Sequence, residues 1–448
     1  MKVLKFGGTS VKSAEMMKHV GEIVKDARAE GQVAVVVSAM SGITDQLIKA
    51  STLASQGNDT YHETLKEIEK KHLQCIQELL PPQHQTRTVA AVKMMLNELE
   101  DVLQGLFLLK EISPKSRDFV MSFGERMSSA IITEYFKTIG LDAQLIDARE
   151  LIVTDDNFGN ALVNFEETDK RIRKYFSRTD KLIVMGGFIA ATINNETTTL
   201  GRGGSDYTAS IVAAALQAKL LEIWTDVDGM MTADPRKVRR TMVLKQLSYI
   251  EALELSHFGA KVLYPPSVQP VPAKSIPLKI KNTFNPAAEG TLVARESVDN
   301  GSPIKGISSI DTVALISLNG SGMVGVSGFA KRLFSALAAG RINVILITQA
   351  SSEHSITVAI NTADAIKAKT LIESEFSTEL KGGLLEPVLV EQDLSILAIV
   401  GENMRNTPNV AGKLFSSLGR NGVNVRAIAQ GSSENNISFV TQNADSRK

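Results

Sequence analysis

The chain has 448 residues, a single cysteine (Cys75), and 49 lysine and arginine residues balanced by 49 aspartate and glutamate residues. At about 100–200 residues per domain, this length predicts roughly two to four domains. Zero net charge gives no electrostatic footprint for a nucleic acid or an anionic membrane. One cysteine excludes an internal disulfide and a thiolate metal cluster, and no apolar run suits a signal peptide or a membrane span. We therefore expect a cytoplasmic protein without nucleic-acid or membrane partners.

Short apolar runs rich in β-branched residues alternate with helical patterns over roughly the first 290 residues, which is typical of an α/β fold with a mainly parallel sheet. The candidate strands are Val3–Phe6, Val33–Ser38, Leu145–Asp147, Leu182–Met185, Leu221–Thr225 and Leu278–Lys281. A helical excursion over about residues 48–112, broken at Pro81-Pro82, is too long for a simple crossover and predicts a helical subdomain. Turn formers at 285–290 and a polar run at 296–302 predict a linker. We therefore expect the first domain to cover residues 1–295.

The remaining third contains an internal repeat. The segment from Gly328 to Glu353 matches a second segment that ends at Glu434, and the offset of 81 residues is the spacing from Gln349 to Gln430. We expect a duplicated strand–helix–strand–strand unit, with copies at 305–390 and 391–448. The first copy continues into a second helix, at 363–375, whereas the second copy stops where that helix should begin. Either the second unit takes its last elements from elsewhere, or the chain is a piece of a longer protein.

Two glycine-rich segments could hold an anion. At the exit of the first strand, Gly7 and Gly8 let backbone N–H groups approach a phosphate, and Lys5 can place a positive charge on it. The segment G-R-G-G-S-D at 201–206 leads into a helical pattern, and the planar guanidinium of Arg202 suits a carboxylate. Each segment could equally be only a turn or a helix cap. Neither is a Walker A loop or a dinucleotide-binding glycine turn.

Other candidate positions also follow predicted strands. Thr225 and Asp226 begin the sequence T-D-V-D-G at a strand end, where the ligands of parallel sheets gather. Ser38 and Thr44 come after the second strand, and Glu125 lies in the sequence F-G-E-R. Hydroxyl groups at such positions can simply cap the next helix. The six histidines show neither zinc-binding nor triad spacing.

Taken in order, these motifs resemble those of the aspartate kinases. They are K-F-G-G-T-S at 5–10, S-A-M-S-G-I-T at 38–44, F-G-E-R at 123–126, G-R-G-G-S-D-Y at 201–207, W-T-D-V-D-G at 224–229, F-G-A-K-V-L-Y-P at 258–265 and Q-x-S-S-E in both repeats. The resemblance covers essentially the whole chain and is nearest to the kinase and regulatory part of bifunctional aspartokinase/homoserine dehydrogenase. It implies the amino acid kinase fold, an αβα sandwich around a mainly parallel sheet, followed by two ACT regulatory units of βαββαβ type.

The same resemblance implies ATP-dependent phosphorylation of the side-chain carboxylate of L-aspartate, with Mg²⁺ bound mainly through the nucleotide phosphates. Lys5 and Asp206 are the implied catalytic residues. The implied ATP-binding residues are Lys5, Gly7, Gly8, Thr225, Asp226, Arg236 and Lys261. The implied aspartate-binding residues are Ser38, Thr44, Glu125, Arg202, Gly203, Gly204 and Ser205. Arg202 would hold the α-carboxylate, and Glu125 the α-ammonium. Met231 stands where many family members have tyrosine.

In the repeats, Ile347, Gln349, Ile428 and Gln430 match effector-contacting positions of threonine-sensitive relatives. We expect an allosteric amino acid there, threonine ahead of lysine, although the glutamines could instead pair with backbone at the repeat interface. A homo-oligomer through the ACT units is also expected. The alternative to the enzyme is a non-catalytic amino-acid sensor built on a kinase fold. The joint presence of Lys5, Glu125, Arg202 and Asp206 favours the enzyme.

Overall fold

A computed structural model covers residues 1–448 and describes residues 1–257, 262–297, 301–349, 354–405, 407–431 and 433–448. The chain forms two compact units. Unit 1 consists of Met1–Met230, Val243–Tyr249 and Val262–Val298, and unit 2 of Met231–Met242, Ile250–Lys261 and Asp299–Lys448. Among the described residues, no helix has both the length and the apolar character that crossing a bilayer requires.

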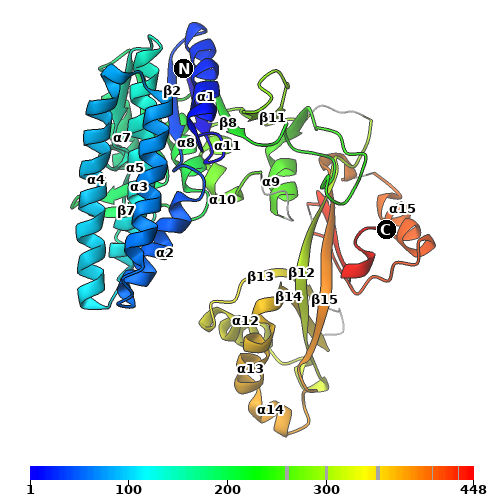
Figure 1. Ribbon diagram of the computed structural model, residues 1–448. Helices are drawn as coiled ribbons and strands as arrows, with labels where there is room; N and C mark the ends of the chain where they lie inside the picture. Colours follow the sequence, from blue (N-terminus) through cyan, green and yellow to red (C-terminus); the bar gives the residue numbers. More distant parts are fainter. Residues whose placement is uncertain (258–261, 298–300, 350–353, 406, 432) are drawn as a thin grey trace. The chain divides into compact units, whose positions relative to one another are not determined.

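Unit 1 is built on an eight-stranded sheet with the order β3-β5-β2-β1-β8-β10-β11-β9. Figure 1 labels β2, β8 and β11 of this sheet. Its strands are β1 (Lys2–Phe6), β2 (Val33–Val37), β3 (Ala143–Ile146), β5 (Leu182–Gly186), β8 (Leu220–Thr225), β9 (Gln246–Ser248), β10 (Leu278–Asn282) and β11 (Thr291–Ala294). All neighbouring pairs are parallel except the antiparallel pair of β10 and β11. The central strands are continuous apolar runs, as β2 shows with five buried residues, because helices cover both faces. All six strands expected from the sequence lie in this sheet, and the αβα prediction is confirmed.

The helices of unit 1 are α1 (Ala14–Ala29), α2 (Ile43–Ser55), α3 (Tyr61–Leu79), α4 (Pro82–Leu109), α5 (Pro114–Thr138), α6 (Ala148–Leu151), α7 (Phe165–Phe176), α8 (Gly204–Ala215), α10 (Pro265–Val268) and α11 (Pro270–Ala273). Helices α1 to α5 share one hydrophobic core with Leu4 and Phe6 of β1. Lys5, which alternates with these residues, points to the other face and reaches α8. The break between α3 and α4 falls at Pro81, and Pro82 occupies the first turn of α4, where proline is tolerated.

A second, three-stranded sheet lies in the same unit. It consists of β4 (Val153–Thr154), β6 (Ile189–Thr192) and β7 (Thr197–Thr199), in the order β4-β6-β7. Strand β7 is made of three threonines, all of them buried. The chain passes from β7 into the glycine-rich segment and then into α8, so this small sheet sets where the segment begins.

Unit 2 contains a six-stranded antiparallel sheet in the order β13-β14-β12-β15-β17-β16. Its strands are β12 (Gly306–Asn319), β13 (Val344–Gln349), β14 (Ser355–Asn361), β15 (Leu389–Val400), β16 (Ala427–Ala429) and β17 (Asn436–Gln442), and its helices are α9 (Tyr249–His257), α12 (Phe329–Ala339), α13 (Ala365–Glu375), α14 (Ser377–Lys381) and α15 (Val410–Arg420). Helices α12 and α15, like β14 and β17, begin and end at the 81-residue offset of the sequence repeat. The duplication is therefore present in the structure.

The two repeats share their central strands. The second half of β12 pairs with β14 of the first repeat, while its first half, from Gly306 to Ile310, pairs with the end of β15 in the second repeat. Helix α9 contacts both partners of this pairing: Ser308 Oγ, in the first half of β12, donates to Leu255 O at 2.8 Å, and the N–H of Glu402, in the second repeat, donates to Glu251 Oε1 at 3.1 Å. The second repeat thus gains a strand from the first half of β12 and a helix, α9, that precedes both repeats. The domain boundaries read from the sequence stay a prediction.

Candidate active site

A cavity of about 360 Å³ in unit 1 opens where β1, β2 and β5 end and α8 begins. It is lined by Lys5, Gly8, Ser38, Ala39, Met40, Ser41, Gly42, Thr44, Asp45, Glu125, Phe188, Gly201, Gly203, Gly204, Ser205 and Asp206. These residues come from the strand exits, the start of α2, helix α5 and the start of α8. The carboxyl ends of parallel strands are the usual place for a ligand in such a sheet.

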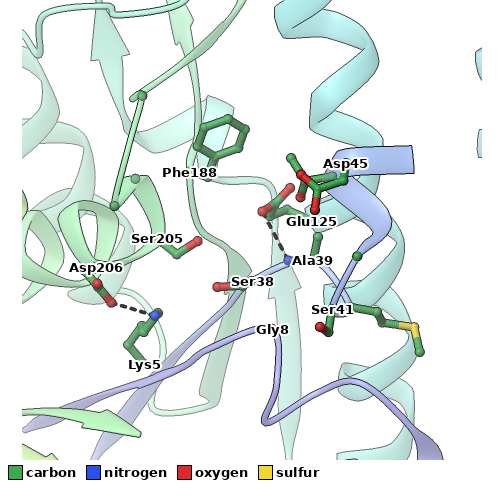
Figure 2. A pocket seen from close by; sticks show the side chains of 16 residues that line it. Lys5, Gly8, Ser38, Ala39, Ser41, Asp45, Glu125, Phe188, Ser205 and Asp206 are labelled. Carbon is green, nitrogen blue, oxygen red and sulfur yellow. Dashed lines mark hydrogen bonds and ion pairs between the residues drawn. The ribbon is translucent and has the colours of Figure 1, made fainter. Parts of the chain in front are cut away.

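Lys5 and Asp206 form an ion pair on one side of the cavity. Lys5 Nζ lies 2.6 Å from Asp206 Oδ1, and both side chains are mostly buried (Figure 2). Asp206 belongs to the first turn of α8, where the helix dipole also favours a negative charge. The pair therefore fixes the ammonium of Lys5 at the cavity wall instead of leaving it free in solvent.

Glu125 lies on the other side of the cavity and is 3% exposed. Its Oε1 accepts the N–H of Ala39 at 3.1 Å, and its Oε2 has no hydrogen-bond partner among the described residues (Figure 2). Burial raises the pKa of Glu125 to about 8, although the bond from Ala39 opposes the increase. A buried carboxylate with a free oxygen is suited to binding a cationic group of a ligand.

The glycine-rich segment approaches the cavity through backbone conformations that favour glycine. Gly203, the N-cap residue of α8, has φ = 72°, and a Cβ there would lie 3.0 Å from Cβ of Tyr264. Gly8, at the exit of β1, is equally confined, because a Cβ would lie 2.9 Å from the carbonyl oxygen of Ala39. These glycines leave the backbone N–H groups and the N-terminus of α8 next to the cavity, an arrangement that favours an anion.

The residues expected to bind aspartate are only partly brought together. Lining the same cavity are Ser38, Thr44, Glu125, Gly203, Gly204 and Ser205. Ser38 is held from behind, because its carbonyl oxygen accepts a hydrogen bond from Ser128 Oγ at 2.8 Å. Arg202 does not line the cavity: it is exposed, and its guanidinium carbon lies 5.1 Å from the centre of the Tyr264 ring, a cation–π distance.

The residues expected to bind ATP are more dispersed. Lys5 and Gly8 line the cavity, and Gly7 is bound to the end of β8 through its N–H, which donates to Trp224 O at 3.1 Å. The next residues of that strand end, Thr225 and Asp226, are joined by a hydrogen bond of 3.2 Å. Arg236 belongs to unit 2, where it forms a bidentate pair with Asp234. Lys261 lies outside the described residues.

The four expected effector positions lie in unit 2. Gln349 and Ile428 line a cavity of about 380 Å³ on the sheet, beside a pair formed by Glu391 and Arg426 at 3.7 Å. Ile347 and Gln430 are exposed and do not line it.

Two residues that line the first cavity, Asp45 and Phe188, lie outside all the motifs that the sequence offered. Asp45 lies in the first turn of α2, directly after Thr44. Phe188 has φ = 67°, an unusual conformation for a bulky residue, and its N–H donates to Thr208 Oγ1 at 3.0 Å. The preceding pair Gly186-Gly187 at a strand end was the only sequence signal for it.

Comparison with known proteins agrees with this architecture. Residues 1–282 match the amino acid kinase family, and residues 316–376 and 397–448 match the ACT domain. Aspartokinase 1 of Arabidopsis thaliana is 33% identical over 455 residues, which cover 99% of this chain and 78% of that protein. The chain belongs to the aspartokinase family.

Other aspartokinases extend the comparison. A structure of E. coli aspartokinase III in complex with aspartate and ADP is 30% identical, with a TM-score of 0.83 over all of this chain and 97% of the other. A second structure of that enzyme, with lysine and aspartate, gives a TM-score of 0.81. The bifunctional aspartokinase/homoserine dehydrogenase 1 of A. thaliana is 39% identical over 450 residues. The match covers 99% of this chain but 49% of that protein, so the chain spans about half the length of its bifunctional relatives.

Proposed function

We propose that this chain transfers the γ-phosphoryl group of ATP to the side-chain carboxylate of L-aspartate, giving 4-phospho-L-aspartate and ADP. One observation supports this reaction above the others: a single cavity has a fixed ammonium, that of Lys5, on one side and a buried carboxylate, that of Glu125, on the other. A zwitterion with an additional anionic end fits between two such groups. The E. coli relative has been solved with aspartate and ADP, which are the substrate and a product of this reaction.

In the proposed complex the α-ammonium of aspartate pairs with Glu125, and its side-chain carboxylate points toward Lys5. Ser38, Thr44 and Ser205 offer hydroxyl groups along the same cavity. Arg202 turns from the ring of Tyr264 toward the α-carboxylate. The attacking carboxylate is already ionised at neutral pH, so the reaction needs no general base.

The nucleotide phosphates are proposed to lie between the exit of β1 and the start of α8. There the N–H groups near Gly8 and the N-terminus of α8 favour the negative charge, and Lys5 stabilises the charge that develops on the transferring group. Asp206 keeps Lys5 oriented for this task. Gly7, Thr225 and Asp226 are proposed to contact the rest of ATP, while the roles of Arg236 and Lys261 stay expectations from the sequence.

Mg²⁺ is proposed to enter with ATP. The parts of the chain that the structure describes contain no group of three or more histidine, cysteine, aspartate or glutamate side chains able to hold a metal ion. In the cavity, Asp206 is already paired with Lys5, and Glu125 faces the ammonium site. The donor set therefore fits a cation bound mainly by nucleotide phosphates and water, whose role is to neutralise phosphate charge.

Regulation is proposed to act through unit 2. Its two repeats match the ACT domain, and E. coli aspartokinase III has been solved with lysine. We propose that an amino-acid effector, threonine ahead of lysine, binds near Gln349 and Ile428, where backbone and side-chain groups line a polar cavity. Pairing of two copies of unit 2 into a homo-oligomer is part of this proposal.

A hydroxylamine-trapping assay tests the reaction. With ATP, Mg²⁺ and L-aspartate, the purified chain should form an acyl phosphate, which hydroxylamine converts to aspartyl hydroxamate. Omitting either substrate should abolish the hydroxamate. If ATP binds, as shown by calorimetry, but no hydroxamate forms, the kinase proposal is wrong and the non-catalytic sensor is favoured.

A further inference from the structure

We propose that Asp118 is a positioning residue of the active site, which holds the glycine-rich segment 201–206 in place from behind. Asp118 lies in α5, seven residues before Glu125, and is fully buried. It does not line the cavity, and nothing in the proposed reaction requires it. A buried carboxylate is expensive to keep unless its charge is satisfied, so its partners indicate its role.

Three donors from two segments point at this carboxylate. Its Oδ2 accepts the N–H of Gly159 at 2.8 Å and the N–H of Thr199 at 3.0 Å, and its Oδ1 accepts the hydroxyl of Thr199 at 2.8 Å. Burial raises the pKa of Asp118, and these three bonds oppose the increase. Hydrogen bonds to an ionised acceptor are shorter and stronger than those between neutral groups.

The two segments that Asp118 joins enclose Gly201. Thr199 is the last residue of β7, two positions before Gly201, and Gly159 belongs to the loop beside it. A Cβ at Gly201 would lie 3.1 Å from Asn160 Oδ1 and 3.6 Å from the carbonyl oxygen of Gly159. One carboxylate therefore fixes both the strand that enters the glycine-rich segment and the loop on which that segment rests.

The other threonines of β7 are also bonded, but to different neighbours. Thr197 accepts from Arg149 at 2.9 Å, and the hydroxyl groups of Thr198 and Thr154 are 2.7 Å apart. Of the three, Thr199 is nearest along the chain to Arg202 and Ser205, the groups proposed to hold aspartate. Loosening the contact between Asp118 and Thr199 should therefore shift the positions of Arg202 and Ser205. It should weaken the binding of aspartate more than that of ATP.

This inference rests on the proposed function, and its test is a set of four variants with steady-state kinetics for both substrates. Asp118→Ala removes both acceptor oxygens and with them all three hydrogen bonds. It should raise the KM for aspartate by about tenfold or more, while the KM for ATP stays within about twofold. In Asp118→Asn, the amide oxygen can accept both backbone N–H groups, and the amide nitrogen can donate to the hydroxyl oxygen of Thr199. It should restore most of the affinity for aspartate.

Thr199→Val removes one of the three bonds and should raise the KM for aspartate by about two- to fivefold. Its matched control is Thr133→Val, another buried threonine, whose hydroxyl bonds within α5 to Ser129 O at 2.6 Å. The control should leave the KM for aspartate unchanged while losing similar thermal stability.

A second readout separates positioning from general loosening. The probe is β-alanine, which is aspartate without the α-carboxylate and therefore cannot bind through Arg202. If Arg202 has moved in Thr199→Val and Asp118→Ala, the ratio of the aspartate KM to the inhibition constant of β-alanine should rise. If Arg202 has not moved, this ratio should stay constant. Unchanged aspartate KM in both variants, or an equal rise of both KM values, would overturn the inference.

If the wild-type chain phosphorylates no aspartate, the proposed function fails instead. Hydrogen exchange then still tests the positioning role, with faster exchange of residues 159–161 and 199–206 in Asp118→Ala expected and unchanged exchange contradicting it.

Discussion

Lys5 and Asp206, far apart in the sequence, meet in a largely buried ion pair with 2.6 Å between Nζ and Oδ1. The pair connects the central strand β1 to the first turn of α8, the two elements between which the phosphates are proposed to lie. Because both side chains are mostly shielded from water, the geometry of the pair matters more than its contribution to stability.

Replacing Lys5 with alanine should affect turnover more than ATP binding. The charge of Lys5 is needed most when negative charge develops on the transferring phosphoryl group, so kcat should fall by about 10²–10³-fold while ATP affinity changes by less than about tenfold. Initial rates and calorimetric titration with ATP measure the two effects. An equal loss in both would contradict a role specific to the transition state.

Asp206→Asn should lower kcat by about tenfold to a hundredfold, because the neutral amide can accept a hydrogen bond from the ammonium of Lys5 but cannot form the ion pair that orients it. The affinity for aspartate, titrated by calorimetry, should change less than kcat. Activity equal to the wild type would show that Lys5 keeps its position without this partner.

The raised pKa of Glu125 predicts a pH dependence of aspartate binding. Below pH 8 the free carboxyl is largely protonated, but the substrate ammonium favours the ionised form. The KM for aspartate should therefore fall as the pH rises from about 6.5 to 8. Binding at pH 7 should also release protons, which calorimetry in buffers of different ionisation enthalpy detects. Glu125→Gln should show neither effect, and a pH-independent wild-type KM would contradict the assignment.

The same group affects stability in a defined direction. Its pKa is about 8 in the folded chain and about 4.5 in the unfolded one, so the folded state binds the proton more tightly. The resulting stabilisation is complete below about pH 4.5 and is lost as the pH rises to about 8. Denaturant unfolding of Glu125→Gln should lack this slope. The free energy of unfolding of Glu125→Gln, relative to that of the wild type, should therefore increase as the pH rises from about 4.5 to about 8.

Gly203→Ala should destabilise unit 1 by about 1–3 kcal/mol, because the residue has φ = 72° and a Cβ would press on Tyr264. Thermal unfolding measures this cost, and the KM for aspartate should rise as well. Gly105→Ala is the matched control. Gly105 lies inside α4 with no atom within 4 Å of its virtual Cβ, so alanine should stabilise the chain by about 0.5–1 kcal/mol. If the two variants change stability alike, the conformational argument fails.

Gln349→Ala should weaken effector binding to unit 2 by about fivefold or more, because the amide offers both a donor and an acceptor to a small amino acid. Calorimetric titration with threonine and with lysine measures the change and identifies the preferred effector. Ile345, on the same strand and not among the residues that line the cavity, provides the control variant Ile345→Val. Unchanged binding by Gln349→Ala would remove this residue from the proposed site.

The sequence by itself determined the elements and the family. Apolar runs and helical periodicity are local properties, so the six strands, the break at Pro81 and the 81-residue repeat could be read directly. The short strands β9 and β11 and the small sheet β4-β6-β7 were missed, because two to four residues carry too little periodicity.

Only the tertiary structure decided which of these residues meet. It brings Lys5 to Asp206 and Glu125 to Ala39, places the guanidinium of Arg202 over Tyr264 instead of in the cavity, and gives the second repeat a strand from the first half of β12. Asp118 gave no sequence signal at all, since a lone aspartate in a helix is usually solvated. Its role depends on donors from two distant segments. Such contacts depend on how strands and loops are ordered in space, and local sequence patterns do not encode that order.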